Sequence, residues 1–322
     1  MAGLLNPLDV KGLELKNRIV LPPMYTGLAT SDGAVTEALV KHYVQRSKAV
    51  GLIIVEHSFI APEGKLGERQ LGCDKDSLVE GLEKLSSSIH ASGVPIVLQI
   101  NHAGRNANPD IAGLQPVGPS PEENVRELKV DEIIEIAERF AEGAERAMRG
   151  GFDGVEIHGA HGFLLNQFFS PLANHRTDLY GGSLENRMRF PLEVIERVKE
   201  KVEGRLLLYR LGSDDLDPKG TLIEHSQRFA VKLEKAGIDI LDVSGGLCGS
   251  RPSELQDVQG YFIPQAQRIK EAVGVPVIGV GGIRDSEYAN QLVLEGKADL
   301  VAVGRSLFRD SKWAEKAVER LK

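Results

Sequence analysis

The stretch Arg149-Gly-Gly-Phe-Asp-Gly-Val-Glu-Ile-His158 decides the fold, because it joins a helix end, a glycine turn and a short apolar strand in one unit. The same order returns at 235–244 and 295–304. A glycine adopts the positive φ that ends a helix, and the apolar run after it suits a strand buried on both faces. Gly93 and Gly274 begin a Gly-Val-Pro variant, in which proline starts the strand. The chain is therefore predicted to repeat a helix–strand unit.

Counting these units predicts eight strands, at 19–24, 52–58, 96–100, 154–158, 206–211, 240–244, 277–280 and 300–303. Helical patterns follow them, at 36–49, 78–91, 131–149, 183–202, 223–235, 264–273, 287–294 and 313–321. Eight strand–helix pairs are typical of a (β/α)8 TIM barrel, which we predict here with an N-terminal hairpin as a cap. A doubly wound sheet is the structural alternative, but a Gly-x-Gly-x-x-Gly turn is missing after the first strand.

Two connections are longer than the others, at 101–130 after the third strand and 159–182 after the fourth. Loops of this length are usually lids or binding loops, and these two leave the barrel face where active sites lie. The fifth helix has the spacing of a capping box at Thr221 and Glu224. The sequence shows no linker, so we expect one domain over 1–322.

Composition excludes several classes of function. The chain has 39 Lys plus Arg against 46 Asp plus Glu, a net charge of −7 that argues against nucleic acid as a partner. Its apolar stretches are shorter than the about 20 residues that span a bilayer, and 1–10 lacks the features of a secretory signal. Two isolated cysteines rule out a thiolate-bound iron–sulfur cluster. We expect a cytoplasmic protein that does not bind membranes.

Glycine-rich loops follow the last two strands, at Gly279-Val-Gly-Gly282 and at Val303-Gly-Arg-Ser306. Exposed backbone N–H groups in such loops form the phosphate site that barrels often use, and Arg305 adds a positive charge. Ser244 and Gly245 follow the sixth strand and line the same pocket in this interpretation. The alternative is that these glycines only make tight turns.

Gln99 and Arg210 lie among apolar residues at the ends of the third and fifth strands. Arginine is seldom buried without a partner, so Arg210 either forms a structural ion pair with Asp214 or Asp215 or faces a ligand that accumulates negative charge.

His158 and His161 leave the fourth strand at the predicted active face. A metal site would need further ligands at a suitable spacing, so we expect no metal. As N–H donors the two imidazoles are suited to polarise a carbonyl oxygen, and the alternative is a pair of structural loop histidines. Tyr25 ends the first strand on the same face, as a packing aromatic, a hydrogen-bond donor or an acid.

Longer motifs carry a family resemblance across nearly the whole chain. The most specific is Asn174-His-Arg-Thr-Asp-Leu-Tyr-Gly-Gly-Ser-Leu-Glu-Asn-Arg-Met-Arg-Phe190, preceded by Asn166-Gln-Phe-Phe-Ser-Pro171. Others are Lys16-Asn-Arg-Ile-Val20, Gln99-x-x-His-Ala-Gly-Arg105 and Glu156-Ile-His158. With these motifs the chain resembles the Old Yellow Enzyme family of FMN-dependent NAD(P)H oxidoreductases.

The resemblance implies a single FMN-binding barrel domain and a role for each matching residue. Gln99 would hydrogen-bond the pyrimidine edge of the flavin, and Arg210 would face its N1 and O2 atoms. His158 and His161 would hydrogen-bond the carbonyl oxygen of the substrate. The isoalloxazine would be bordered by Pro23, Met24 and the backbone around His57, and the phosphate would be held by Ser244, Gly245, Gly282, Gly304 and Arg305.

The implied reaction has two halves, in which NADH or NADPH gives hydride to flavin N5 and an α,β-unsaturated carbonyl compound then takes it at the β-carbon. The proton donor departs from the family pattern. Phe163 stands where a tyrosine is usual, and Tyr25 stands where relatives commonly carry Cys or Thr. Water or another donor would then have to serve, and Tyr25 would either tune the flavin or act as a substitute acid, which we treat as a hypothesis.

Other functions stay open at this point. The same FMN enzyme would pass electrons to a quinone or dioxygen, or oxidise or demethylate a substrate. A flavin-free barrel lyase or isomerase would use the phosphate site for its substrate, and a non-catalytic flavin-binding protein would bind FMN alone. A homo-oligomer is an expectation from the family. Larger relatives add an iron–sulfur and a nucleotide domain, whereas this sequence ends at Lys322, directly after the predicted eighth helix.

Overall fold

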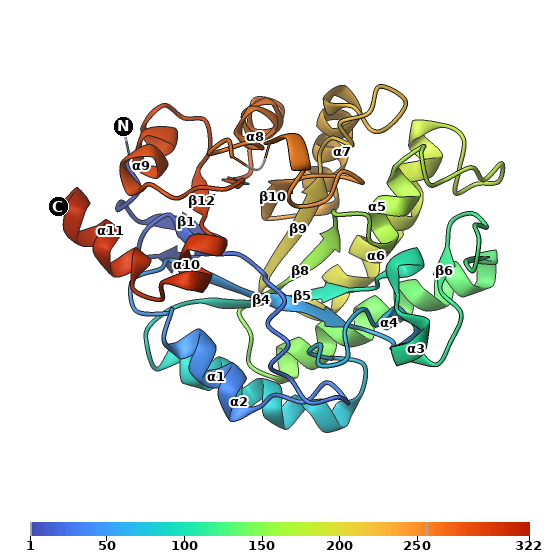
Figure 1. Cartoon of the computed structure of the whole chain (residues 1–322), viewed down its shortest axis with the longest axis horizontal. Coiled ribbons are helices and arrows are strands. Elements are labelled where there is room, and N and C mark those ends of the chain that lie inside the picture. The colour runs from blue at the N-terminus through green and yellow to red at the C-terminus, as the bar shows by residue number, and fades with distance from the viewer. Residues whose placement is uncertain (1, 256) are drawn as a thin grey trace.

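The computed structural model describes residues 2–255 and 257–322, so Met1 and Gln256 lie outside the described residues. Within those ranges eight strands close into a barrel with the order β10-β11-β12-β3-β4-β5-β8-β9 (Figure 1). Every neighbouring pair is parallel. The strands are β3 (Ile19–Leu21), β4 (Leu52–Phe59), β5 (Ile96–Asn101), β8 (Gly154–Gly159), β9 (Leu206–Gly212), β10 (Ile240–Ser244), β11 (Val277–Gly279) and β12 (Leu300–Ala302). The predicted TIM barrel is confirmed.

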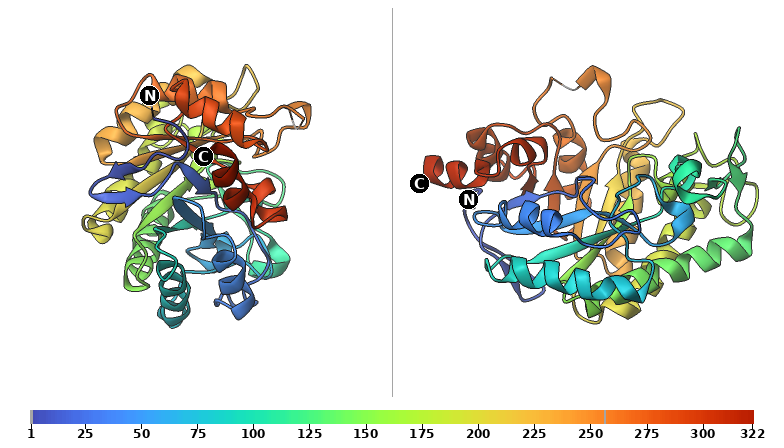
Figure 2. Two further views of the ribbon diagram at one scale, coloured as in Figure 1. Left: turned by 90° about the vertical axis from the view of Figure 1, so that its left-hand side faces the viewer. Right: turned by 60° about the horizontal axis from the view of Figure 1, so that its bottom comes forward.

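Helices surround the barrel on all sides, and both chain ends lie on one side of the molecule beside the last helices (Figures 1 and 2). The helices that follow the strands are α1 (Glu37–Val44), α2 (Val79–His90), α4 (Val130–Arg149), α6 (Leu184–Val202), α7 (Ile223–Ala236), α8 (Ile263–Lys270), α9 (Ser286–Leu294) and α11 (Trp313–Leu321). Shorter helices lie in the loops, at α3 (Pro109–Ala112), α5 (Leu164–Phe169) and α10 (Arg305–Arg309). No helix of the described chain is long and apolar enough to cross a bilayer.

The first strand and first helix are shorter than predicted. β3 stops at Leu21 because Pro22 and Pro23 have no N–H to donate to a neighbouring strand. α1 stops at Val44, after which the chain continues with shorter-range bonds such as Arg46 N–H to Tyr43 O at 3.0 Å. As a result Pro22 to Tyr25 form an irregular segment at the mouth of the barrel.

A hairpin closes the amino-terminal end of the barrel, as predicted. β1 (Leu8–Val10) and β2 (Leu13–Leu15) pair antiparallel. Val10 and Leu15 are buried in the same apolar cluster as the inward-facing residues of the strands, which are Val20, Leu52, Ile54, Val97, Leu206, Leu208, Ile240, Ile278, Leu300 and Ala302. Apolar side chains therefore fill the barrel interior, and the hairpin covers its amino-terminal end. A ligand can bind only at the carboxyl ends of the strands.

The helix ends confirm one sequence rule and correct another. Gly237 ends α7 with φ 106°, as the repeated unit predicts. The capping box predicted from Thr221 and Glu224 is wrong, because Leu222 is the N-cap and its N–H donates to His225 Nδ1 at 3.3 Å. Thr221 lies one residue too early, and its N–H instead donates to Asp215 Oδ2 at 2.7 Å.

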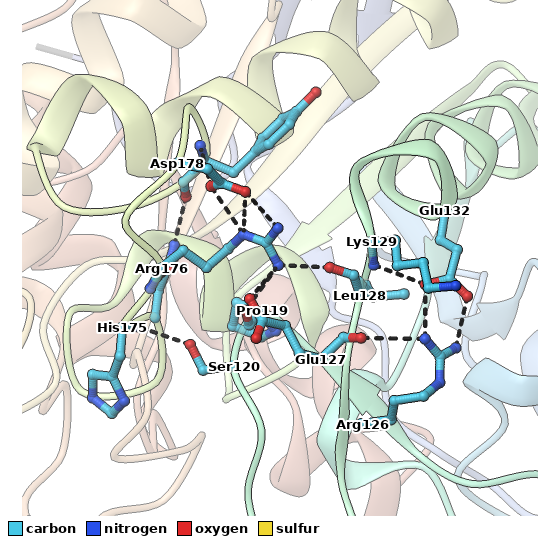
Figure 3. Close-up of polar contacts among 12 residues, drawn as sticks. Pro119, Ser120, Arg126, Glu127, Leu128, Lys129, Glu132, His175, Arg176 and Asp178 are labelled. Atoms are coloured by element: carbon cyan, nitrogen blue, oxygen red, sulfur yellow. Dashed lines mark hydrogen bonds and ion pairs between the residues drawn. The ribbon is translucent and has the colours of Figure 1, made fainter.

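The two long connections are tied together by Arg176 (Figure 3). This buried side chain donates to Pro119 O at 3.1 Å and to Leu128 O at 2.7 Å, both in the loop after β5. In its own loop, after β8, it pairs with Asp178 at 2.6 Å. The motif at 174–190 therefore joins the loop after β8 to the loop after β5.

Candidate active site

A cavity of about 890 Å³ opens at the carboxyl ends of the barrel strands. It brings together the predicted site residues from all parts of the chain, namely Pro23, Met24, Tyr25, His57, Gln99, His158, His161, Arg210, Ser244, Gly282, Gly304 and Arg305. Gly245 is the predicted residue that does not line it. Among the described residues, no group of three or more His, Cys, Asp or Glu side chains is arranged to hold a metal ion.

Gly245 lies buried behind the cavity wall and supports His161. Its carbonyl accepts the His161 N–H at 3.0 Å. His161 has φ 58°, a left-handed conformation that is costly for a residue with a side chain and is found mostly at functional sites. The Ser244 Oγ lies 2.7 Å from His161 Nε2 and so fixes the direction of the ring. Ser244 and Gly245 therefore both contact His161 directly.

His158 and His161 form an edge-to-face pair with ring centroids 5.2 Å apart. The Ala160 N–H donates to His158 Nδ1 at 3.3 Å, which leaves the His158 proton on Nε2 in the neutral ring. Burial lowers the pKa of both histidines well below the ordinary value, and the charge of Arg210 lowers them further. Both rings are neutral at physiological pH, and His158 carries its proton on Nε2.

Aromatic rings continue from this pair across the cavity. Phe163 packs edge-on against His158 at 4.7 Å and lies 5.5 Å from His57. Tyr25 stacks on His57 at 5.8 Å and remains 42% exposed. The phenol of Tyr25 and the ring of Phe163 thus both lie close to the His57 imidazole.

A buried cluster of polar groups lies beside the histidines. Gln99 Nε2 donates to Glu156 Oε1 at 2.7 Å, and Arg210 Nε lies 3.4 Å from Asp242 Oδ2. The alternative in which Arg210 pairs with Asp214 or Asp215 is therefore wrong. Asp242 takes that place because it stands opposite Arg210 in the β9–β10 register. Burial and the neighbouring Asp242 raise the pKa of Glu156 well above its ordinary value, and burial raises the pKa of Asp242 as well.

At the other end of the cavity Arg305 donates from Nη2 to Tyr261 Oη at 3.2 Å. A Cβ at Gly282 would come within 2.9 Å of the Tyr261 ring, and one at Gly304 would come within 2.9 Å of Met24 Sδ. A larger residue at either position would therefore push against a cavity side chain.

Several lining residues were missed by sequence reasoning, namely Arg251, Asp257, Tyr261, Arg284 and Arg309. Three of them lie in the connection between β10 and α8. The available signal was the length of this connection, because the predicted strand ends at 244 and the next predicted helix begins only at 264.

The residues present fit FMN. Gln99 Oε1 is buried without a partner among the described residues, as expected for an acceptor that meets a pyrimidine N–H. Arg210 supplies a cation beside it. Gly282, Gly304 and Arg305 supply open backbone and a guanidinium for a phosphate.

Comparison with known proteins agrees with this geometry. The model of the NADH:flavin oxidoreductase / NADH oxidase family matches residues 3–322. The chain belongs to this family. The resemblance found in the sequence is therefore confirmed, together with the class of enzyme and with FMN and NAD(P)H as the cofactors of that class.

Curated relatives of this oxidoreductase differ in length. It is 45% identical to the NADH oxidase of Thermoanaerobacter brockii over 96% of its own chain but only 50% of that protein. It is 38% identical to the NADPH dehydrogenase of Bacillus pumilus, over 99% of its own chain and 95% of that protein. The chain thus spans about half the length of the first relative and nearly all of the second.

Solved structures show the same barrel. 2-Naphthoyl-CoA reductase in complex with 2-naphthoyl-CoA superposes with a TM-score of 0.93 at 26% identity, covering 99% of this chain and 52% of that one. The old yellow enzyme homologue from Zymomonas mobilis superposes with a TM-score of 0.87 at 29% identity, covering 100% of this chain and 94% of that one.

Proposed function

We propose that this chain is an FMN-dependent NAD(P)H oxidoreductase that reduces the C=C bond of α,β-unsaturated carbonyl compounds. The observation that carries the proposal is the neutral pair His158 and His161 on the wall of a cavity that fits FMN. Two neutral N–H donors side by side suit a carbonyl oxygen, which has two lone pairs and gains negative charge during reduction.

The proposed cofactor residues divide the cavity into two ends. Gln99 and Arg210 would hold the pyrimidine edge of FMN, and Pro23, Met24 and the His57 backbone would border its rings. Gly282, Gly304 and Arg305 would hold the phosphate. When bound, FMN supplies hydride transfer between the nicotinamide nucleotide and the substrate. Arg210 would stabilise negative charge at the pyrimidine edge.

His158 and His161 would activate the substrate by hydrogen-bonding its carbonyl oxygen. His158 presents Nε2–H, because its Nδ1 already accepts from the backbone. His161 is held in place by Ser244 and by the Gly245 carbonyl. Because burial keeps both rings neutral, they can draw electron density onto the oxygen as hydrogen-bond donors.

Tyr25 is the proposed proton donor, because Phe163 has no proton to give. A positioned donor contributes about 10²- to 10⁴-fold to a rate, so we expect Tyr25→Phe to slow enone reduction by about 10²-fold. The rate of flavin reduction by NADPH should stay within about twofold, since no proton donor is needed there. Stopped-flow absorbance of each half-reaction measures both, and enone reduction at the wild-type rate in Tyr25→Phe would contradict the role.

A second candidate keeps FMN and changes the electron acceptor. The NADH oxidase relative and the absence of a phenol at Phe163 favour dioxygen or a quinone. Initial rates with cyclohexenone, benzoquinone and dioxygen, at equal NADPH or NADH, separate the two candidates. The proposal predicts faster turnover with the enone than with dioxygen, and enone turnover at the no-substrate rate would favour the second candidate.

A further inference from the structure

The amide of Gln70 has a fixed orientation. Its side chain is fully buried, and its Oε1 accepts the N–H groups of Leu66 at 2.8 Å and Gly67 at 3.3 Å. Its Nε2 lies 2.8 Å from His57 Nδ1 and 3.0 Å from the His57 carbonyl oxygen. Since Oε1 must be the acceptor of the two backbone N–H groups, Nε2 is the donor to His57.

This orientation decides the tautomer of His57. Because Nδ1 accepts from Gln70, the single proton of the neutral ring is on Nε2. Burial and then the charge of Arg210 lower the pKa of His57 to about 4, so the ring stays neutral at physiological pH. His57 lines the cavity and is only 8% exposed, and no described residue accepts a hydrogen bond from its Nε2. The cavity therefore contains a third imidazole N–H donor.

The Nε2–H of His57 lies on a different strand of the barrel from His158 and His161. His57 lies on β4, whereas His158 lies at the end of β8 and His161 just beyond it, with β5 between the two strands. The centroids of His57 and His158 are 6.4 Å apart. A carbonyl oxygen has two lone pairs, and His158 with His161 would use both. The N–H of His57 faces the cavity, where it is free to bind another acceptor.

We infer that His57 is a specificity-determining residue, whose Nε2–H binds a second oxygen of the substrate, so that the site favours ene-diones and similarly doubly activated alkenes over simple enones. Gln70 is the positioning residue that sets the tautomer. The inference rests on the proposed function, because it places a carbonyl substrate in the cavity beside FMN.

Two ketones with one carbon skeleton test the preference. Isophorone has one carbonyl, and ketoisophorone has a second one across the ring. The experiment titrates each into the oxidised holoenzyme and follows the flavin absorption bands. His57→Phe keeps the ring stacking with Tyr25 and Phe163 and removes the N–H. It should weaken ketoisophorone binding about 3- to 10-fold more than isophorone binding.

His57→Gln supplies the rescue, because its amide N–H reaches the position of Nε2, and it should recover most of the ketoisophorone affinity. His175→Ala, at an exposed histidine outside the cavity, is the matched control. Equal weakening of both ketones in His57→Phe, or no change in either, overturns the inference. Failure of the wild type to bind either ketone contradicts the proposed function instead.

Imidazole nitrogen NMR of the holoenzyme tests the tautomer without any substrate. The wild type should show His57 protonated on Nε2 alone, in a signal that His57→Gln removes. In Gln70→Glu a carboxylate oxygen faces Nδ1, which should move the proton to Nδ1. Protonation of wild-type His57 on Nδ1 overturns the inference, whatever affinities the two ketones show.

Discussion

Glu56 is a carboxyl group buried directly beneath the segment that carries Tyr25. Its Oε2 accepts the Thr26 N–H at 3.1 Å, and its own N–H donates to Tyr43 Oη at 2.8 Å. Burial raises the pKa of Glu56 to about 7. The folded pKa is above the unfolded one, so the contribution of this group to stability is complete below about pH 4.5 and is lost as the pH rises through about 7.

Glu56→Gln should remove this pH dependence, because the amide oxygen still accepts from Thr26 but does not ionise. The free energy of unfolding of the variant, relative to wild type, should rise by about 3 kcal/mol between about pH 4.5 and pH 8. Urea unfolding at a series of pH values measures the difference. A difference that is constant over this range would show that Glu56 ionises normally in the folded protein.

The three cavity histidines should not titrate in the neutral range. Burial lowers the pKa of His57 to about 4 and those of His158 and His161 well below the ordinary value. In the Glu56→Gln background, the affinity of the oxidised enzyme for isophorone should therefore be constant between about pH 5.5 and pH 8. A loss of affinity with a midpoint near about 6.5 would mean that at least one of the rings becomes charged there.

At the scale of elements, Arg176 joins the two long loops that stand above the barrel. Its guanidinium satisfies the buried carbonyls of Pro119 and Leu128 and pairs with Glu127 at 3.1 Å (Figure 3). The two carboxylate partners are partly exposed, but removing the guanidinium leaves two buried carbonyls unpaired, which costs about 1–3 kcal/mol for each.

Arg176→Ala should lower the free energy of unfolding by about that amount and expose 102–129 to proteases first. Limited proteolysis with mass mapping, alongside chemical unfolding, measures both effects. Arg189→Ala is the control, since this partly exposed arginine makes a single bond to Leu179 O at 2.8 Å. Equal effects in the two variants would contradict the anchoring role.

The elements also show what the sequence can predict. Strand positions followed from local signals, and β10 has the predicted bounds, because a glycine turn and an apolar run mark each strand. The partner of Arg210 did not follow. Asp242 is 32 residues away by number and becomes its neighbour only through the β9–β10 register. The Gln70–His57 contact was equally hidden, because it forms only when the loop after β4 folds back.

At the scale of the whole molecule, charge is distributed unevenly. The chain has a net charge of −7, yet the cavity is lined by Arg210, Arg251, Arg284, Arg305 and Arg309 against the carboxylate of Asp257. A cluster of one sign inside a cleft focuses the field and attracts ligands of the opposite charge.

Association of apoprotein with FMN should therefore slow with salt. Between about 10 mM and 300 mM NaCl we expect the association rate constant to fall about tenfold, because the phosphate is attracted by the arginines. Quenching of flavin fluorescence in a stopped-flow instrument gives the rate. Riboflavin, which has no phosphate, is the control and should change less than about twofold. A parallel fall for both flavins would exclude electrostatic steering.

The visible spectrum of the purified holoenzyme under anaerobic conditions tests the central claim most directly, followed through addition of NADPH or NADH and then of cyclohexenone. We expect flavin bands that bleach with the nicotinamide nucleotide and return with the enone, in step with loss of the enone. A flavin that bleaches and stays reduced in the presence of the enone would contradict it, because the neutral histidines would then serve some other acceptor.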